Sequence, residues 1–213
     1  MSTDAWYWAH DARPDQLDSL ATPGLRLVRL SHYGADRYAT LYHAGTPTQY
    51  RLGLDAATAS SCTDAIAITV DGRSQFAVVT DPSVRTRTHV DLDEDEARSA
   101  IGEIVDAATY TLGGARRYAI VVRDDSTPSW LLPNLTPADL HDEVRRLDAG
   151  LVRLRAHIGE HRFTAIAART PSTWYGDLSA DDVASRLERH RAVPVDLDAT
   201  ATPEGVRFTV VMR

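Results

Sequence analysis

The sequence predicts an α+β domain made of five strand–helix–strand–strand units. Two observations predict this class. A short motif occurs five times along the 213 residues: a polar residue, an aromatic ring, a small residue and then β-branched or aliphatic residues. The segments between the motifs also share one order of strand, helix start and turn. The motifs begin at Arg37, Gln75, Arg117, Arg162 and Arg207, which gives spacings of 38, 42, 45 and 45 residues.

Each unit opens with aromatic or β-branched residues that favour a strand, at 6–8, 50–52, 88–90, 130–132 and 174–175. A helix start follows. Asp93 and Ser179 each precede an acidic first turn, Thr136 precedes Pro137, and Asp11 before Pro14 is a looser case. These residue types supply capping oxygens, so we expect helices directly after them.

Apolar residues then recur at helical spacing. The expected buried faces are Leu17 and Leu20; Ala97, Ile101, Ile104, Val105 and Ala108; Leu140, Val144 and Leu147; and Val183 and Leu187. The second unit differs, because residues 56–65 are rich in Ser and Thr. We expect it to be the outlier, with a truncated or absent helix between Asp55 and Ile66.

A strand and a polar or glycine turn complete each unit before the motif strand. The expected strands are 25–30, 66–70, 109–112, 151–157 and 194–199. The chain is therefore predicted to be a single domain of about fifteen strands and five helices. Its units span approximately 5–46, 47–84, 85–127, 128–171 and 172–213. A β-propeller has a similar period, but its blades have four strands and no helix, so we set that architecture aside.

Alternation along the motif strand separates an aromatic row from a small row of Ala39, Ala77, Ala119, Thr164 and Thr209. Small residues let a helix approach closely, so we place the helices on that side. The aromatic row then forms either a second core face or a trough that contacts a ligand. The candidate binding residues are Tyr38, Phe76, Tyr118, Phe163, Phe208, Trp8, Trp130 and Trp174.

The units resemble the bacterial tandem-repeat units in the N-terminal domain of polyglycine hydrolases. The resemblance rests on the N-terminal Trp, the capped helix, the segment 24–34 and Arg37-Tyr38-Ala39. It covers essentially the whole chain and is weakest at 50–65. It implies one curved, half-barrel-like sheet with the helices on its outer face. In that family a separate serine β-lactamase-like domain performs hydrolysis with Ser-x-x-Lys, so the resemblance implies a fold and no catalysis.

Composition excludes several function classes. All 23 basic residues are arginine, which removes the P-loop, the pyridoxal phosphate Schiff base and the Ser-x-x-Lys pair. The net charge of -7 argues against a general nucleic-acid binder. No segment has the length and apolarity of a membrane span or a signal peptide. As written, the chain reads as cytoplasmic, although a domain of a secreted protein would look the same. Replacement of Lys by Arg suggests a GC-rich bacterial genome.

No catalytic, metal or cofactor site is predicted. His157 and His161 have the spacing of two metal ligands but flank a turn, and we expect them to be exposed. Asp91, Asp93 and Asp95 fit a helix cap better than a calcium loop. Cys62 is expected to be a small filler rather than a nucleophile. The motif arginines Arg37, Arg117, Arg162 and Arg207 are expected at one rim, paired with carboxylates or with an anionic ligand. Other histidines, including His32, are expected at turns or on the surface.

Three functions remain open. The first is a non-catalytic domain that binds an extended peptide, Gly-rich linker or glycan along its sheet. The second is a hydrolase with a His/Asp site assembled between units, with His10 or His43 as the best guess for the base. The third is an interaction or inhibitor subunit. A cleft with His, Asp and Ser would favour the second, and an aromatic trough without titratable groups would favour the first. We expect no intrinsic hydrolytic activity, and the sequence fixes no oligomeric state.

Overall fold

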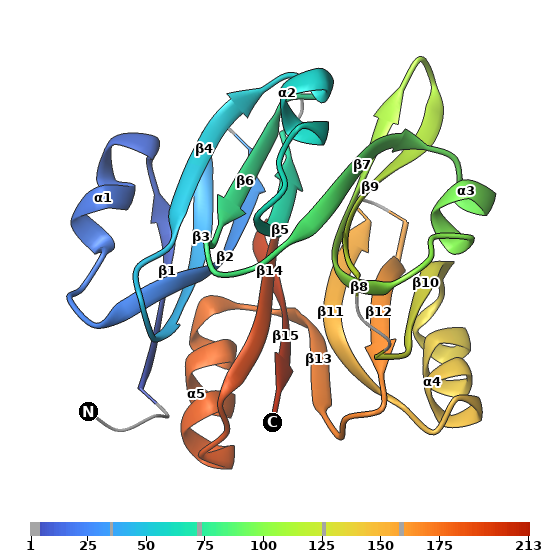
Figure 1. Ribbon diagram of the computed structural model, residues 1–213. Helices are drawn as coiled ribbons and strands as arrows, with labels where there is room; N and C mark the ends of the chain where they lie inside the picture. The colour runs from blue at the N-terminus through green and yellow to red at the C-terminus, as the bar shows by residue number, and fades with distance from the viewer. Residues whose placement is uncertain (1–4, 35, 72–73, 125–126, 158–159) are drawn as a thin grey trace.

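The computed structural model describes residues 5–34, 36–71, 74–124, 127–157 and 160–213. In this part of the chain the fold is mostly β, with fifteen strands in five separate antiparallel sheets and five α-helices (Figure 1). We number the units 1 to 5 by sheet, each with three strands and one helix. The elements that belong to each sheet follow one another in the order strand, helix, strand, strand.

The elements have the following bounds. Unit 1 contains β1 (Trp6–Ala12), a short 3-10 helix (Pro14–Gln16), α1 (Leu17–Leu20), β2 (Leu25–Tyr33) and β3 (Arg37–Ala44). Unit 2 contains β4 (Gln49–Leu54), α2 (Ala56–Ser60), β5 (Ala65–Val70) and β6 (Phe76–Thr80). Unit 3 contains β7 (Thr86–Leu92), α3 (Glu94–Arg98), β8 (Glu103–Leu112) and β9 (Ala115–Arg123). Unit 4 contains β10 (Ser129–Leu135), α4 (Pro137–Arg146), β11 (Gly150–His157) and β12 (Arg162–Ala168). Unit 5 contains β13 (Thr173–Leu178), α5 (Ala180–His190), β14 (Pro194–Thr202) and β15 (Gly205–Met212).

Every sheet has the same strand order. The third strand of the unit, which carries the motif, lies in the middle between the first and the second strand. We call the second strands β2, β5, β8, β11 and β14 the inner strands. The single curved, half-barrel-like sheet expected from the resemblance is not what the structure has, because its described strands form five separate sheets and none of these closes into a barrel.

The inner strands surround a central axis. Each one packs against the next, and β14 packs against β2, so the five units close into a ring (Figure 1). The sequence argument set aside a radial arrangement because a propeller blade has four strands and no helix. Here a three-stranded sheet with a helix on one face takes the place of such a blade.

The helices lie on the aromatic face of the motif strand, so the predicted placement was wrong. In unit 3, Tyr118 packs with Ala97 of α3 in one apolar cluster. The same cluster contains Ile166 from the opposite face of β12 in unit 4. Corresponding clusters join units 1 and 2, 2 and 3, 4 and 5, and 5 and 1. The small residues therefore let the preceding unit, rather than the unit's own helix, approach the sheet.

The helix caps follow the sequence prediction. The side chains of Asp93, Thr136 and Ser179 accept hydrogen bonds from the backbone N–H three residues later. Asp55 does the same at α2. As predicted, α2 is short, but it is not the outlier, because α1 has four residues and α3 five, like α2 itself.

The predicted face of the third helix was also wrong. α3 ends at Arg98, Ile101 is 86% exposed, and β8 begins at Glu103. Between them Gly102 has φ +116°, and a Cβ there would lie 2.6 Å from the carbonyl oxygen of Arg123. The backbone of Arg123 therefore lies too close to position 102 for any residue other than glycine, and α3 does not continue through this position. Ile104 and Ala108 are buried as strand residues instead.

A left-handed residue lies near the end of the first strand in every unit. The five residues are Asp11, Gly53, Asp91, Asn134 and Asp177, with φ between 55° and 67°. At each of them the register with the middle strand shifts. Asp, Asn and Gly are the residue types that tolerate this conformation. The bulge turns the chain from the strand into the helix cap two residues later.

Candidate functional site

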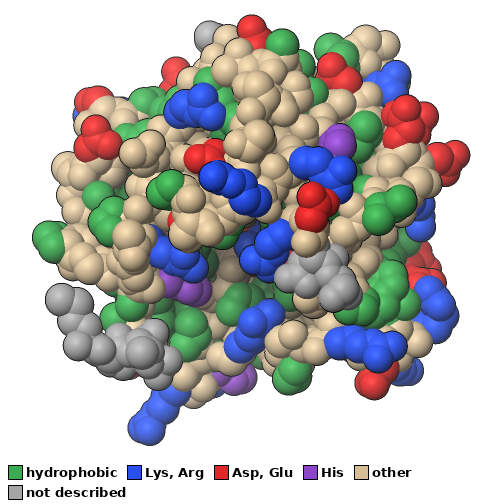
Figure 2. All heavy atoms as spheres, viewed as in Figure 1, with side chains coloured by type: hydrophobic (Ala, Val, Ile, Leu, Met, Phe, Trp, Pro, Cys, Tyr) green, Lys and Arg blue, Asp and Glu red, His purple; other side chains and the backbone are tan. Residues whose placement is uncertain are grey.

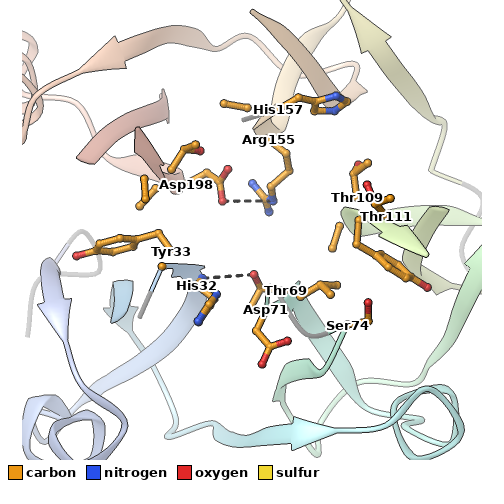
Figure 3. A pocket seen from close by; sticks show the side chains of 18 of the residues that line it. His32, Tyr33, Thr69, Asp71, Ser74, Thr109, Thr111, Arg155, His157 and Asp198 are labelled. Carbon is orange, nitrogen blue, oxygen red and sulfur yellow. Dashed lines mark hydrogen bonds and ion pairs between the residues drawn. The ribbon is translucent and has the colours of Figure 1, made fainter. Parts of the chain in front are cut away.

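A cavity of about 710 Å³ opens at one end of the central axis. It is lined by the ends of the inner strands and the turns that follow them, and all five units contribute (Figure 3). The ring thus brings together residues from Arg29 to Ala201 that are far apart in the sequence. It is the larger of the two cavities described here. Because large concave sites with convergent polar groups commonly bind ligands, this cavity is the candidate site.

Two layers of inner-strand side chains form the floor. In each unit, the residue of the deeper layer pairs in register with the same position of that unit's motif strand. These residues are Arg29, Ala67, Asp106, Arg153 and Asp196. Two residues further along, the upper layer consists of Ser31, Thr69, Ala108, Arg155 and Asp198. Units 1, 3, 4 and 5 thus place three arginines and three aspartates at the axis, and we call these six residues the axial charge cluster.

Asp106 is the centre of the axial charge cluster. Its Oδ2 accepts from Arg29 Nη1 at 2.5 Å and from the backbone N of Ile68 at 2.7 Å. Its Oδ1 accepts from Arg155 Nη2 at 2.6 Å. The side chain is 0% exposed. A carboxylate from unit 3 therefore holds guanidinium groups from units 1 and 4 away from water, where charge-assisted hydrogen bonds are strong.

Asp196 repeats this role from unit 5. Its Oδ2 accepts from Arg155 Nη1 at 2.5 Å and from the backbone N of Leu154 at 2.8 Å. Burial would raise the pKa of this carboxyl, but Arg155 and Arg29 hold the pKa below its ordinary value. Burial likewise opposes the charge of Arg155, but Asp196 and Asp106 raise its pKa above the ordinary value. Asp196 and Arg155 therefore both stay ionised.

Of the three aspartates in the axial charge cluster, Asp198 is the one that lines the cavity, together with Arg29 and Arg155. Its Oδ1 accepts from Ser31 Oγ at 2.6 Å, whereas Arg29 Nη2 and Arg155 Nε lie 3.8 and 3.9 Å away. Burial raises the pKa of this carboxyl above its ordinary value, since these arginines are more distant than those around Asp196. Carboxyls with raised pKa values at a cavity are candidates for ligand contact or proton transfer.

Two histidines stand in the cavity wall, on units 1 and 4 (Figure 3). His157 is 6% exposed at its side chain, its Nε2 lies 2.9 Å from Thr164 Oγ1, and its Nδ1 has no hydrogen-bond partner. Burial and then Arg116 lower the pKa of His157 to about 4. Burial also lowers the pKa of His32. Both rings are therefore neutral near pH 7. The expectation that His157 is exposed was wrong, because the ring folds it inward.

The rim of the cavity is polar. Arg116 of unit 3 pairs with Glu160 of unit 4 at 2.5 Å. Asp36 and Asp71 also line the cavity. Hydroxyl groups complete the wall and belong to Thr69, Ser74, Thr109, Thr111 and Thr200. The site therefore offers carboxylates and hydroxyls from several directions to a hydrophilic ligand.

The eight predicted binding residues lie elsewhere. Tyr38, Phe76, Tyr118, Phe163 and Phe208 are at most 9% exposed and belong to the five apolar clusters. Trp8 packs edge-on against Phe208, and Trp174 against Phe163. Trp130 also packs against an apolar cluster. None of the eight is among the residues that line the central cavity. Their common feature is packing between units.

The other sequence candidates are dispersed. His10 is exposed and stacks on Trp8, and His43 contacts the carbonyl of Pro194 at 2.7 Å. Cys62 is buried, and burial raises the pKa of its thiol. Two of the motif arginines pair with the left-handed aspartates of their own units, Arg37 with Asp11 at 3.1 Å and Arg207 with Asp177 at 3.5 Å. A search of the described residues for clusters of metal-ligating side chains finds none.

The axial charge cluster was missed by sequence reasoning although a signal exists. Arg29, Asp106, Arg153 and Asp196 each lie between two apolar residues of an inner strand. A charge in a strand usually points to solvent. An alignment of the inner strands with one another, rather than of the motif strands, places these charges at equivalent positions and with both signs. That pattern is typical of side chains that meet each other.

Comparisons with known proteins leave the family open. No protein-family model matches this sequence, and no curated protein matches it either. The resemblance of the units to those of polyglycine hydrolases therefore stays a prediction. Among the helices that the structure describes, none has the length and apolarity needed to cross a membrane.

Figure 2 shows the molecule in the same view as Figure 1, and arginine side chains gather near the middle of this face. The overall charge is nevertheless -7. Arg153 of the axial charge cluster has a side chain that is 21% exposed.

Proposed function

We propose that the chain is a domain of five tandem repeats whose central cavity binds a small hydrophilic cation. Three features support the repeats: one strand order in all five sheets, one position for the left-handed bulge, and one type of contact between consecutive units. The ligand follows from the charges of the cavity.

The balance of charge in the cavity carries the proposal. Four acidic residues line it, Asp36, Asp71, Glu160 and Asp198, against the three arginines Arg29, Arg116 and Arg155. The arginines are engaged, because Arg29 and Arg155 donate to buried carboxylates of the axial charge cluster and Arg116 pairs with Glu160. The lowered pKa values leave both histidines neutral. The Arg116–Glu160 pair is neutral as a unit, and the raised pKa of Asp198 favours its uncharged form. The net negative charge that a ligand meets therefore comes from Asp36 and Asp71, together with the hydroxyl groups.

Calorimetric titration of the protein tests this proposal near neutral pH. The cationic probes are ethanolamine, glucosamine and putrescine, with glycerol as the uncharged probe and glycerol phosphate as the anionic one. We expect saturable binding of at least one amine and none of glycerol phosphate. Asp71→Asn keeps an acceptor for the backbone N of Gln75 and removes one charge. It should weaken amine binding by about tenfold, which corresponds to ~1.4 kcal/mol.

Asp142→Asn is the matched control. Asp142 lies on α4, is 76% exposed at its side chain and pairs with Arg145 outside the cavity. Equal affinity in Asp71→Asn and the native protein, or tighter binding of glycerol phosphate than of any amine, would contradict a cation site.

The expected binding of an extended partner loses its main support. That expectation depended on aromatic rows facing an open trough, and these rings are buried between units. The floor of the cavity is also closed by the axial charge cluster, so the site accommodates a small molecule better than a chain that passes through it.

A hydrolase is the second candidate. The observation in its favour is that His32, His157, Asp71, Asp198 and Ser74 line one cavity. Against it, the only hydroxyl bonded to His157 among the described residues is Thr164, which is 1% exposed and so poorly placed to attack a substrate. We expect no turnover of amide, ester or glycosidic substrates. Turnover that disappears in a cavity variant would replace the binding proposal with this one.

A further inference from the structure

A second cavity, of about 470 Å³, lies away from the axis in unit 5 and its junction with unit 4. Three segments form it: the connection between β12 and β13, the residues at and after the end of α5, and the end of β15. Its lining residues are Thr170, Pro171, Ser172, Thr173, His190, Ala192, Met212 and Arg213. It shares no lining residue with the central cavity, and we call it the junction pocket.

The junction pocket has the opposite chemistry to the central cavity. Its described lining includes one arginine, one histidine and three hydroxyl side chains, and no Asp or Glu. This composition is unusual in a chain with 30 acidic residues and a net charge of -7. Apolar atoms nevertheless make up most of the lining surface, and its apolar residues are Pro171, Ala192 and Met212.

Arg213 provides the guanidinium of the junction pocket. Among the residues that the structure describes, no carboxylate forms an ion pair with it. Burial, and then the neighbouring Arg153, lower its pKa. Its backbone is fixed by two hydrogen bonds with Val193, at 2.9 and 3.0 Å. An arginine held in this way presents a fork of donors suited to an oxyanion.

Ser172 provides a second group that lacks a partner. Its Oγ is buried and forms no hydrogen bond with the protein. Buried hydroxyls are nearly always bonded, so this atom calls for a partner that the protein itself does not supply. The connection around it is tightly packed, because a Cβ on Gly150 would lie 2.1 Å from the carbonyl oxygen of Thr170 and 2.8 Å from Ser172 Oγ. Ser172 is therefore held in place beside the pocket.

We propose that the junction pocket binds a small organic oxyanion, a carboxylate or phosphate group attached to a short apolar body. Arg213 donates to the oxyanion, the hydroxyls of Ser172 and its threonine neighbours add further donors, and the apolar body contacts Met212 and Ala192. This ligand is independent of the one in the central cavity, because the two sites differ in charge and share no residue.

Chemical-shift titration of the isotopically labelled full chain tests the proposal at low ionic strength. The probes are phenyl phosphate, benzoate and inorganic phosphate, with benzyl alcohol as the uncharged probe. We expect saturable shifts for phenyl phosphate or benzoate at the amides of Thr170, Ser172, Thr173 and Arg213, and none for benzyl alcohol. The stronger of the two organic anions identifies the head group. Weak binding of inorganic phosphate at the same amides supports the oxyanion site. The difference in affinity between phenyl phosphate and inorganic phosphate then measures the contribution of the apolar body.

The variants locate the interaction. Arg213→Gln should weaken binding about tenfold or more, Arg213→Lys should weaken it less, and Ser172→Ala should weaken it by a smaller factor. Arg145→Gln is the control, since Arg145 lies on α4, is 70% exposed and pairs with Asp142. Melting curves show whether each variant is folded.

Three results would overturn the proposal: no saturable shift with any anion, shifts centred on the central cavity, or equal affinity in Arg213→Gln and Arg145→Gln. The first and third results leave the cation proposal untouched, because it depends on Asp71 and on amine probes, whereas anion shifts centred on the central cavity would count against that proposal as well.

Discussion

His157 shows how a ring fold perturbs a single residue. The sequence places it beside a turn, where a histidine is ordinarily exposed. In the fold, however, the ends of the inner strands converge on the axis and enclose it. The result is an imidazole with one bonded nitrogen and one without a partner. Its pKa falls from 6.5 to about 4, because burial and then Arg116 disfavour the protonated form.

This shift predicts a pH dependence of stability. Between pH 6.5 and about 4 the unfolded chain binds a proton at His157 and the folded chain does not. The contribution of neutral His157 to the free energy of unfolding is therefore fully present above pH 6.5 and is lost as the pH falls towards 4. Urea unfolding across this range should show a smaller loss of stability in His157→Gln than in the native protein. His10→Gln, at an exposed histidine, is the control, and parallel pH profiles for all three proteins would contradict the assignment.

The residues of the axial charge cluster also set a limit on sequence reasoning. Arg29 and Asp196 lie in strands that the sequence predicted, whereas Asp106 fell within the predicted third helix. None of the three could be paired, because the pairing connects units 1, 3 and 5 across a ring that local patterns do not encode. Removing one partner from such a buried set typically costs about 3–5 kcal/mol, so these residues belong to the stability of the fold as well as to the cavity floor.

At the scale of the element, the left-handed bulge is the feature that all five units share. Asn134 is the informative case, because its backbone N–H and C=O are bonded to Thr164 and Arg162 while its buried Oδ1 has no partner. Its φ is 55°. The equivalent residue in unit 2 is Gly53, which shows that the position needs a backbone conformation and no particular side chain.

Substitution of Asn134 therefore has an expected order. Asn134→Ala should destabilise the protein by about 1 kcal/mol, since a left-handed conformation costs roughly 1–2 kcal/mol for residues with a Cβ. Asn134→Gly should be neutral or stabilising, because it removes that cost and the unbonded oxygen. Chemical denaturation of both variants tests the order. A more stable Ala than Gly variant would show that the side chain matters more than the conformation.

The elements were largely predictable from the sequence, and their faces were not. Capping residues such as Asp93 and Ser179 predicted helix starts, because caps act over three or four residues. The end of α3 was missed, since the requirement at Gly102 comes from Arg123 on another strand. The side on which each helix packs was also assigned wrongly, because small residues such as Ala119 permit close approach without specifying which neighbour approaches.

At the scale of the whole molecule, closure of the ring makes the first and last units neighbours. Leu41 of unit 1 is 0% exposed and lies in one cluster with Val183 and Leu187 of α5. In an open array each unit contacts only its sequence neighbours, and the ends unfold first. Here the terminal units are packed like the others.

Leu41→Ala tests closure. We expect a loss of about 2–5 kcal/mol, the usual range for truncating a buried leucine. Amide exchange should accelerate in β15 and α5 as well as in β3, because the lost contact stabilises both ends of the chain. Leu112→Ala, at a side chain that is 45% exposed in the β8–β9 hairpin, is the control. Faster exchange confined to unit 1 would indicate that the ring is open in solution.

The axial charge cluster has a consequence for how such a molecule can arise. Five identical copies of the unit would place five like charges, or five neutral groups, at each layer of the axis, and the former would repel one another. The observed set of Arg29, Asp106, Arg153 and Asp196 with Ala67 requires each copy to differ from its neighbours at one position. For the proposed tandem repeats, a neutral and bonded centre is thus available only to copies that differ in a coordinated way, and exchanging an arginine-bearing unit with an aspartate-bearing one would alter it even if every sheet still formed.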